Sequence, residues 1–195
     1  MKYLDNLSEI VKILQDGGVI LCPTDTIWGL SCDAFDAKAV AKIFDIKRRD
    51  PDKPLILLIS KLSVLMKYVT DLHPRIENLL AHHVQPLTII HRASSLVPKH
   101  LIGDDGTIAI RLTSHPLLVN LMAELGNPLV STSANLQGSS TPSYYNEIEE
   151  IIKSQVNYIC TTGRQQPEEQ ETVSASSASL IVSYTREGEL IFIRE

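Results

Sequence analysis

The stretch that decides the fold class is residues 107–135, TIAIRLTSHPLLVNLMAELGNPLVSTSAN. Residues 107–112 are mostly apolar and predict a strand. His115-Pro116 then opens a helix whose apolar residues recur at helical spacing until Gly126 ends it. Residues 128–130 predict a second strand, which leads into the polar run 131–135. A strand, a helix and a strand in direct succession are typical of an α/β domain.

The same alternation continues on both sides of this stretch. A hairpin around residues 186–188 is expected near the end, so some of the strand pairing should be antiparallel. These patterns predict an α/β fold with a mixed sheet whose faces are covered by helices. The further strands are expected at residues 19–22, 27–32, 55–59, 87–90, 158–160, 179–182 and 189–193. The further helices are expected at residues 7–14, from an N-cap at Asp36 to the basic turn at 47, after a cap at Ser60, at 74–83, and from a cap at Ser143 to 152.

Length and composition predict a single globular domain that spans residues 1–195. The chain is 44% hydrophobic and 21% charged, and it has no apolar run of the roughly 18 residues that a membrane span needs. The N-terminus lacks the apolar core of an export signal, so a cytoplasmic protein is expected. A net charge of −5 argues against broad nucleic-acid binding but permits a local basic pocket.

Several common kinds of site are not indicated by the sequence. The three cysteines form no C-x-x-C pair and are expected to be small buried apolar residues. The histidines do not show H-x-x-x-H spacing, so no metal ion held by the protein is expected. The sequence also contains no phosphate-loop, dinucleotide-turn or nucleophile-elbow motif. The polar segment 161–177 is expected to form a mobile loop.

Two distant segments predict the two halves of an anion-binding site. Residues 47–53 read KRRDPDK, and Lys47 and Arg49 would lie on one side of an extended turn. Residues 131–135 read STSAN and follow a predicted strand with hydroxyl and amide groups. Cations and donors together suit phosphate. Each half also has a simpler interpretation, because cations favour a helix C-terminus and serines often cap a helix.

Two further features are candidates for a binding site. Pro23-Thr24-Asp25-Thr26 is a polar turn that either lines a pocket or merely reverses the chain. Arg111 ends an apolar strand and either binds a ligand carboxylate or pairs with a neighbouring acid. Ligands of open α/β sheets bind beyond the carboxyl ends of strands. The loops after residues 22, 112 and 130 are therefore expected to meet at one place.

Taken together, the motifs resemble those of the YrdC-like family of threonylcarbamoyl-adenylate synthases. The resemblance covers nearly the whole chain, with the motifs in the order of the family. Since the chain is short, it resembles the single-domain type of this family. The matching motifs are PTDTIWGL at 23–30, KRR at 47–49 with KPL at 53–55, RLTSHP at 111–116, STSAN at 131–135 with Gly138, and more faintly SLIV at 179–182.

The resemblance implies a twisted open α/β sheet with a deep central cavity lined by positive charge. It implies a reaction that joins L-threonine, bicarbonate and ATP into threonylcarbamoyl-adenylate and releases pyrophosphate. Mg²⁺ would accompany ATP, held by phosphates and water. The product would pass to separate partner proteins that modify tRNA. Weak RNA binding by the basic cavity would be compatible with this role, and no membrane contact is implied.

The resemblance also assigns roles to individual residues of this sequence. Lys47 and Arg49 would be the catalytic residues, because they would neutralise charge on the leaving pyrophosphate. The residues expected around L-threonine are Thr26, Arg111, Ser131 and Ser179, with Arg111 on its carboxylate. The residues expected around ATP are Lys47, Arg49, Lys53, Ser133, Asn135, Thr141 and Arg194.

Some positions depart from the family pattern, and two other functions stay open. Trp28 stands where tyrosine is common, Lys53 replaces a frequent asparagine, and the last motif carries Leu180 and Ser183 in place of threonine and aspartate. One alternative is a paralogue of unknown substrate, against which the retained K-x-R and S-x-N elements count. The other is an RNA-binding module, against which the acidic net charge and the few aromatic residues count.

Overall fold

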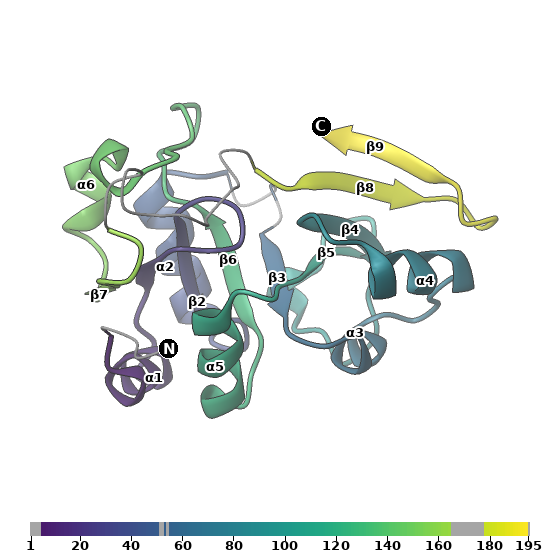
Figure 1. Cartoon of the computed structure of the whole chain (residues 1–195), viewed down its shortest axis with the longest axis horizontal. Helices are drawn as coiled ribbons and strands as arrows, with labels where there is room; N and C mark the ends of the chain where they lie inside the picture. Colours follow the sequence, from purple (N-terminus) through teal and green to yellow (C-terminus); the bar gives the residue numbers. More distant parts are fainter. Residues whose placement is uncertain (1–4, 51–52, 54, 165–177, 195) are drawn as a thin grey trace.

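The computed structural model describes residues 5–50, 53, 55–164 and 178–194. Within these residues, strands from the whole length of the chain form one mixed sheet in the order β7-β1-β2-β6-β3-β5-β4-β8-β9 (Figure 1). The predicted α/β class is confirmed. The strands are β1 Ile20–Cys22, β2 Gly29–Asp33, β3 Ile56–Ile59, β4 Leu87–Arg92, β5 Thr107–Leu112, β6 Leu129–Ser133, β7 Tyr158–Ile159, β8 Leu180–Tyr184 and β9 Leu190–Arg194.

Polar side chains cap the start of some of the helices. At the start of α2, Asp36 accepts hydrogen bonds from the backbone N–H groups of Lys38 and Ala39, at 2.8 and 3.1 Å, so the predicted N-cap is confirmed. None of the helices in the described residues is long and apolar enough to cross a membrane. The helices are α1 Leu7–Gln15, α2 Ala37–Lys47, α3 Leu62–Tyr68, α4 Pro74–His82, α5 Pro116–Leu125 and α6 Glu150–Lys153, with 3₁₀ turns at Lys99–Leu101 and Tyr145–Glu147.

Two apolar cores cover the two faces of the sheet. On one face, Leu58 and Leu129 pack with α1 and α5, which lie side by side in Figure 1. On the other face, Leu57 and Val130 pack with α2. Alternate residues of β3 and β6 thus point to opposite faces, as the pleat requires. Ser131 follows Leu129 on the face of β6 that α1 and α5 cover. On this face the apolar side chains of β6 are therefore followed by polar ones.

Three local expectations were wrong. Ser60 does not cap α3, whose N-cap position is Lys61 and has no side-chain cap bond. The helix expected after Ser143 is divided into the 3₁₀ turn Tyr145–Glu147 and the short α6. The strand expected to end at residue 130 continues through Ser133. Residues 131–133 remain extended because all three pair with β2 and Ser131 also pairs with β3, so strand pairing overrides the turn preference of serine.

The direction of β6 also corrects the expected position of the site. β6 is antiparallel to β3, whereas β5 is parallel to β3. The carboxyl ends of β5 and β6 therefore lie at opposite edges of the sheet, and the loops after residues 112 and 130 do not meet at one edge. Arg111 of β5 and Ser131 of β6 instead line one cavity on the sheet face, together with Thr24 and Thr26 of the loop that joins β1 to β2.

Most of the polar segment expected to be a mobile loop, residues 165–177, lies outside the described residues. The described residues that precede it are held by Asp5, whose carboxylate is buried. This carboxylate accepts hydrogen bonds from the backbone N–H groups of Thr161 and Thr162, at 2.6 and 2.8 Å, and the bonds lower the pKa of Asp5 although burial opposes them. The chain at 161–162 is thereby fixed to the N-terminal segment.

The end of α5 offers a test of backbone strain. Gly126 has φ 78°, and an added Cβ would meet no atom within 4 Å, so only conformational preference opposes substitution. We expect Gly126→Ala to lower the free energy of unfolding by about 1 kcal/mol and Gly126→Asn by less, since asparagine tolerates this conformation. Urea denaturation measures both. Equal stability of Gly126→Ala and the wild type would contradict this explanation.

Candidate active site

A cavity of about 350 Å³ opens on the face of the sheet against which α1 and α5 pack. Its floor consists of side chains from β3, β5 and β6, among them Ile56, Ala109 and Ser131, which share one face of the sheet. Its walls come from the loop between β1 and β2, from the turn after α2, and from the strands β8 and β9. Widely separated parts of the chain thus contribute to one hollow.

The cavity brings together most of the side chains that the sequence singled out. Two predicted site residues, Lys47 and Asn135, do not line it but lie directly behind its wall, as described below. The predicted residues that line it are Thr26, Arg49, Lys53, Arg111, Ser131, Ser133, Thr141, Ser179 and Arg194.

The loop between β1 and β2 is closed by the hydroxyl of Thr24. This hydroxyl donates to the backbone carbonyl of Ile27 at 2.8 Å and accepts from the backbone N–H of Thr26 at 3.0 Å. It also lies 2.9 Å from the hydroxyl of Thr26. Because the only proton of Thr24 Oγ1 is already given to Ile27, the hydroxyl of Thr26 must be the donor of this last bond. The loop is therefore rigid and polar, and its hydroxyl protons have a fixed direction.

The direction of these protons decides what Thr26 can offer a ligand. Its hydroxyl donates to Thr24 and accepts a hydrogen bond from Nη1 of Arg111 at 3.1 Å. One lone pair remains for a ligand in the cavity. Thr26 therefore presents an acceptor to the cavity, which suits an amine or a hydroxyl group, while Arg111 beside it presents donors.

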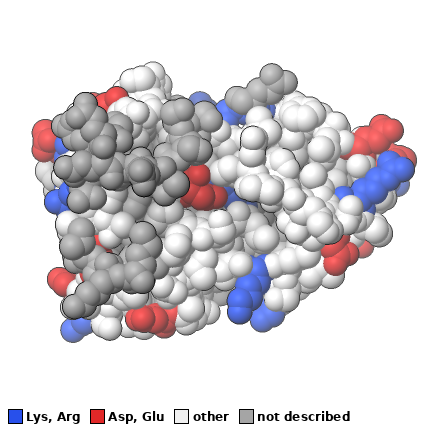
Figure 2. Space-filling view, in the orientation of Figure 1, with Lys and Arg blue, Asp and Glu red and all other residues white. Residues whose placement is uncertain are grey.

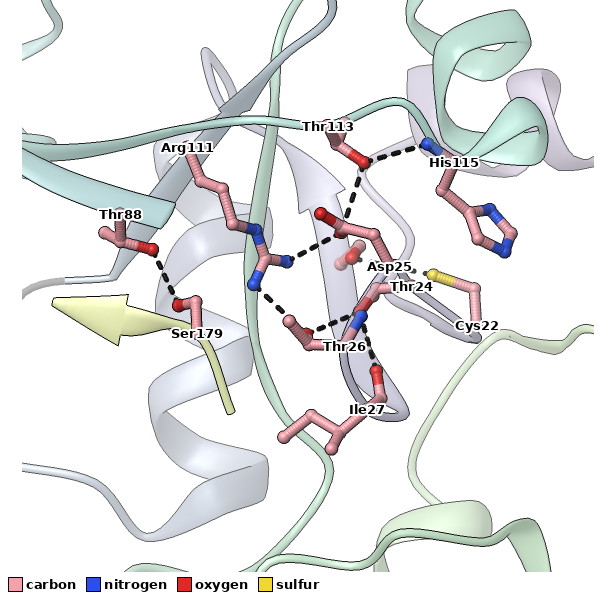
Figure 3. Close-up of polar contacts among 11 residues, drawn as sticks. Cys22, Thr24, Asp25, Thr26, Ile27, Thr88, Arg111, Thr113, His115 and Ser179 are labelled. Atoms are coloured by element: carbon pink, nitrogen blue, oxygen red, sulfur yellow. Dashed lines mark hydrogen bonds and ion pairs between the residues drawn. The ribbon is translucent and has the colours of Figure 1, made fainter. Parts of the chain in front are cut away.

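Arg111 lies at the carboxyl end of β5, and its side chain is buried (Figure 3). Nη2 lies 3.4 Å from the carboxylate of Asp25, and Nη1 donates to Thr26. Its buried Nε has no hydrogen-bond partner among the described residues. Burial lowers the pKa of Arg111, the carboxylate of Asp25 opposes that shift, and Arg194 adds to it. Arg111 thus pairs with a neighbouring acid and also lines the cavity, so both of its predicted roles are compatible with the structure.

Ser131 and Ser133 place hydroxyl groups on the floor of the cavity. Ser131 is buried in β6 opposite Ser31, and Ser133 is paired with Gly29. A Cβ at Gly29 would lie 2.8 Å from Oγ of Ser131 and 3.1 Å from the carbonyl of Thr132. Gly29 is therefore the residue that lets β2 approach the serine side chains closely.

The wall opposite the β1–β2 loop is formed by the last two strands. Oγ of Ser179 lies 2.8 Å from Oγ1 of Thr88 on β4, and both residues are buried. Arg194, at the end of β9, donates from Nη2 to the backbone carbonyl of Ser179 at 2.9 Å. Ser179 and Arg194 are thus held beside each other, and Arg194 adds a cation to the cavity.

The basic turn does not have the extended form that the sequence predicted. Lys47 is the last residue of α2, and Arg48 follows with φ 50°, in the left-handed region. This reversal sends the side chains of Lys47 and Arg49 in different directions, so they do not share one side of the turn. Arg49 lines the cavity, and its Nε donates to the backbone carbonyl of Lys53 at 3.1 Å.

Lys47 points into the protein and is only 1% exposed. Its ammonium group donates to the backbone carbonyl of Ser133, to the backbone carbonyl of Asn135 at 2.6 Å, and to Oδ1 of Asn135 at 3.4 Å. Burial, and secondarily the charge of Arg49, lower the pKa of Lys47 to about 8. Lys47 therefore fixes the chain at the end of β6, and the two predicted halves of the site are in direct contact.

Asn135 acts within the loop that follows β6. Its side-chain amide donates to the backbone carbonyls of Leu136 and Ser139, at 3.1 and 2.7 Å. The amide is thus engaged in closing the loop 135–139, next to a smaller cavity of about 230 Å³. Lys47 and Asn135 together determine where the hydroxyl of Ser133 and the loop toward Thr141 stand.

Among the described residues, the charged side chains that line the cavity are all basic, namely Arg49, Lys53, Arg111 and Arg194. Apolar side chains of β3, β4 and β8 surround them, which strengthens their attraction for an anion by excluding water. On the face drawn in Figure 2, the Lys and Arg side chains of the described residues form separate small groups and not a continuous basic surface. The site is therefore suited to a compact ligand with two anionic parts.

Asp25 is the site residue to which the sequence assigned no role. It lies between Arg111 and Thr113, and Oγ1 of Thr113 donates to its carboxylate at 3.2 Å (Figure 3). A signal was present, because Thr24 and Thr26 flank Asp25 in a polar turn and an arginine within a buried strand needs an acid nearby. The sequence could not show that these two segments meet.

Three comparisons place the chain among known proteins. The family model Sua5_yciO_yrdC, described as Telomere recombination, matches residues 12–188. A protein from Pseudoalteromonas translucida named Threonylcarbamoyl-AMP synthase is 36% identical over 161 residues, which are 81% of this chain and 86% of the relative. The crystal structure of E. coli YciO is similar with a TM-score of 0.80 and 28% identity, over 97% of this chain and 88% of YciO.

A further solved structure shows the same fold in a protein that was crystallised with an amino acid. P. abyssi Sua5 complexed with L-threonine is similar with a TM-score of 0.81 and 23% identity, over 96% of this chain. The chain spans about half of that protein, since the match covers 53% of it. The fold, the order of the motifs and the family match agree. The chain belongs to the Sua5/YciO/YrdC family.

Proposed function

We propose that this protein is an L-threonylcarbamoyladenylate synthase, which forms threonylcarbamoyl-AMP and pyrophosphate from L-threonine, bicarbonate and ATP. The observation that carries the proposal is that one cavity holds Arg111 with the acceptor Thr26 and, in addition, a separate group of cations. An amino acid and a nucleotide phosphate need these two kinds of partner. The name of the Pseudoalteromonas relative, and the complex of P. abyssi Sua5 with L-threonine, support it.

L-Threonine would bind at the end of the cavity formed by the β1–β2 loop. Its carboxylate would accept hydrogen bonds from Arg111, whose guanidinium group still has donors to give. The free lone pair of Thr26 would accept from the amine or from the side-chain hydroxyl. Ser131 on the floor and Ser179 on the far wall complete the polar surroundings, and the apolar side chains between them suit the methyl group.

ATP would bind at the end formed by Arg49, Lys53, Ser133, Thr141 and Arg194. Arginine forks and a lysine ammonium are the usual partners of phosphate oxygens. Because the charged side chains that line the cavity are basic in the described part of the chain, a hard cation would find its ligands on the phosphates of ATP. We therefore propose that Mg²⁺ enters as part of the nucleotide substrate and is held by phosphates and water.

The chemistry requires no activated side chain of the protein. The neutral amine of L-threonine forms a bond to the carbon of bicarbonate, and one water molecule leaves to give a carbamate. A carbamate oxygen then bonds to the α-phosphorus of ATP, the bond to the bridging oxygen breaks, and pyrophosphate leaves. Positioning of reactants can supply about 7–11 kcal/mol of such a barrier. Arg49 would stabilise the charge that develops on the pyrophosphate.

The wider role follows from the product. A mixed carbamoyl–phosphate anhydride is an acyl donor that water destroys, so a partner protein must accept it soon after release. We propose that the acceptors are tRNA-modifying proteins. Because the substrates ATP and L-threonine and the final acceptor tRNA occur together in the cytoplasm, this proposal carries a cytoplasmic location with it.

The decisive experiment measures pyrophosphate release by the purified protein. Release from ATP is expected only when both L-threonine and bicarbonate are present, and the product should carry the mass of threonylcarbamoyl-AMP. Release without L-threonine would favour a paralogue with another substrate. Absence of release together with salt-sensitive RNA binding would favour the RNA-binding module.

A further inference from the structure

We propose that Asp25 is a positioning residue of this enzyme, which holds the guanidinium group of Arg111 in the orientation that receives the carboxylate of L-threonine. This inference rests on the proposed function, because it concerns how the same site binds L-threonine. It is carried by the ion pair between the buried Arg111 and the partly buried Asp25, which joins the end of β5 to the loop after β1. The motif around either residue does not show this contact by itself.

The loop presents its three polar side chains in two directions. Thr24 and Thr26 are buried and line the cavity, and they are bonded to each other at 2.9 Å. Asp25, between them, points the other way and lines a separate cavity of about 570 Å³ at the carboxyl ends of β3 and β5. Its carboxylate therefore stands behind Arg111, and it does not itself reach a ligand in the first cavity.

Asp25 and Thr26 together hold both ends of the guanidinium fork. Nη2 of Arg111 lies 3.4 Å from the Asp25 carboxylate, and Nη1 donates to Thr26 at 3.1 Å. Thr113 fixes the carboxylate in turn, with its hydroxyl at 3.2 Å. With both terminal nitrogens anchored, the plane of the guanidinium group is set, and its unpartnered Nε has one fixed direction.

The charges around Arg111 show why an acid is needed here. Arg111 is buried, and Arg194 disfavours its charge, whereas Asp25 favours it. Among the described residues, Asp25 is the acid with which Arg111 forms an ion pair, and the charged side chains that line the substrate cavity are all basic. Without the Asp25 carboxylate, the buried guanidinium group of Arg111 would be held only by the hydroxyl of Thr26. It could then turn toward solvent or toward the second cavity.

The test compares Asp25→Ala with Asp25→Asn. Asparagine keeps an oxygen that can accept from Arg111 and Thr113 but loses the charge, whereas alanine loses both. We expect Asp25→Ala to raise the KM for L-threonine about 10–100-fold, the size of effect that a misplacement of about 1 Å produces. The increase for Asp25→Asn should be smaller. The KM for ATP and the kcat at saturating L-threonine should change less than about threefold in both variants, because Arg49 and Lys53 are untouched.

A matched control is the ion pair on α6 between the exposed Glu150 and the partly buried Lys153, at 2.8 Å. Glu150→Gln removes one charge in the same way and should leave the KM for L-threonine unchanged. Thermal unfolding of all variants separates a local effect from loss of the fold. A KM for Asp25→Ala within about twofold of the wild type would overturn the inference.

Binding of L-threonine by calorimetry, without turnover, keeps this inference distinct from the proposed function. If the wild type binds L-threonine but releases no pyrophosphate, the synthase assignment fails, and the role of Asp25 is still decided by the Kd values of the variants. If the wild type releases pyrophosphate and Asp25→Ala binds L-threonine as tightly, only the inference about Asp25 fails. If the wild type does not bind L-threonine, both are overturned.

Discussion

Replacing Arg49 by alanine is expected to lower the kcat for pyrophosphate release by about 10²–10³-fold, the loss seen when one preorganised donor to a developing charge is removed. Arg49 lines the cavity beside Lys53 and Arg194, where the leaving pyrophosphate would lie. The midpoint of thermal unfolding should change little, because Arg49 belongs to the turn after α2 and not to either apolar core.

The neighbouring Arg48 supplies the control for this experiment. It is exposed, has φ 50° and does not line the cavity. Arg48→Gln also removes one positive charge from this turn. It should keep kcat within about twofold of the wild type, as expected for the substitution of an exposed residue. If Arg49→Ala retains full activity, or if Arg48→Gln loses as much, Arg49 does not stabilise the leaving group.

Replacing Lys47 by methionine is the second change with a large expected effect. The variant keeps the apolar stem but removes the ammonium group, so the buried carbonyls of Ser133 and Asn135 lose their donor. A displacement of about 1 Å in this segment would lower kcat about 10²-fold. The KM for L-threonine should stay within about threefold of the wild type, because Arg111 and Thr26 do not contact Lys47. Steady-state kinetics of pyrophosphate release measure both constants.

The buried charge of Lys47 also predicts a dependence of stability on pH. Its pKa is lowered from 10.5 to about 8 in the folded protein. Between these values the unfolded chain binds more protons at this residue, so the contribution of Lys47 to the free energy of unfolding rises with pH. The cost of its buried charge is complete below a pH of about 8 and disappears as the pH approaches 10.5.

The Lys47→Met variant isolates this contribution from other titrating groups, such as Tyr158, whose pKa burial raises to about 12. We expect the free energy of unfolding of the wild type, relative to that of Lys47→Met, to increase across the window between about 8 and 10.5. Urea denaturation at several pH values measures the difference. A difference that does not vary with pH would show that the charge of Lys47 is not destabilised by burial.

The regular elements could largely be predicted because their signals are local. Strand β5 has the predicted bounds, and α2 and α5 have the predicted cap residues Asp36 and Gly126. Periodicity and capping depend on residues within one or two turns of the chain. Residues 131–133 were wrongly predicted to be a loop. They form part of a strand in the centre of the sheet, and such a strand is stabilised by neighbours that are distant in sequence, here β2 and β3.

The α/β class, the family and the kinds of side chain that gather in the cavity could be predicted from the amino-acid sequence, because each of these depends on composition, local periodicity or a motif. The inward direction of Lys47, which holds Ser133 and Asn135, and the direction of Arg49 toward the cavity became known from the folded structure. The folded structure also shows that Asp25 is the partner of Arg111. The reason is that strand order and direction, and the backbone reversal at Arg48, bring together groups whose contact no local pattern encodes.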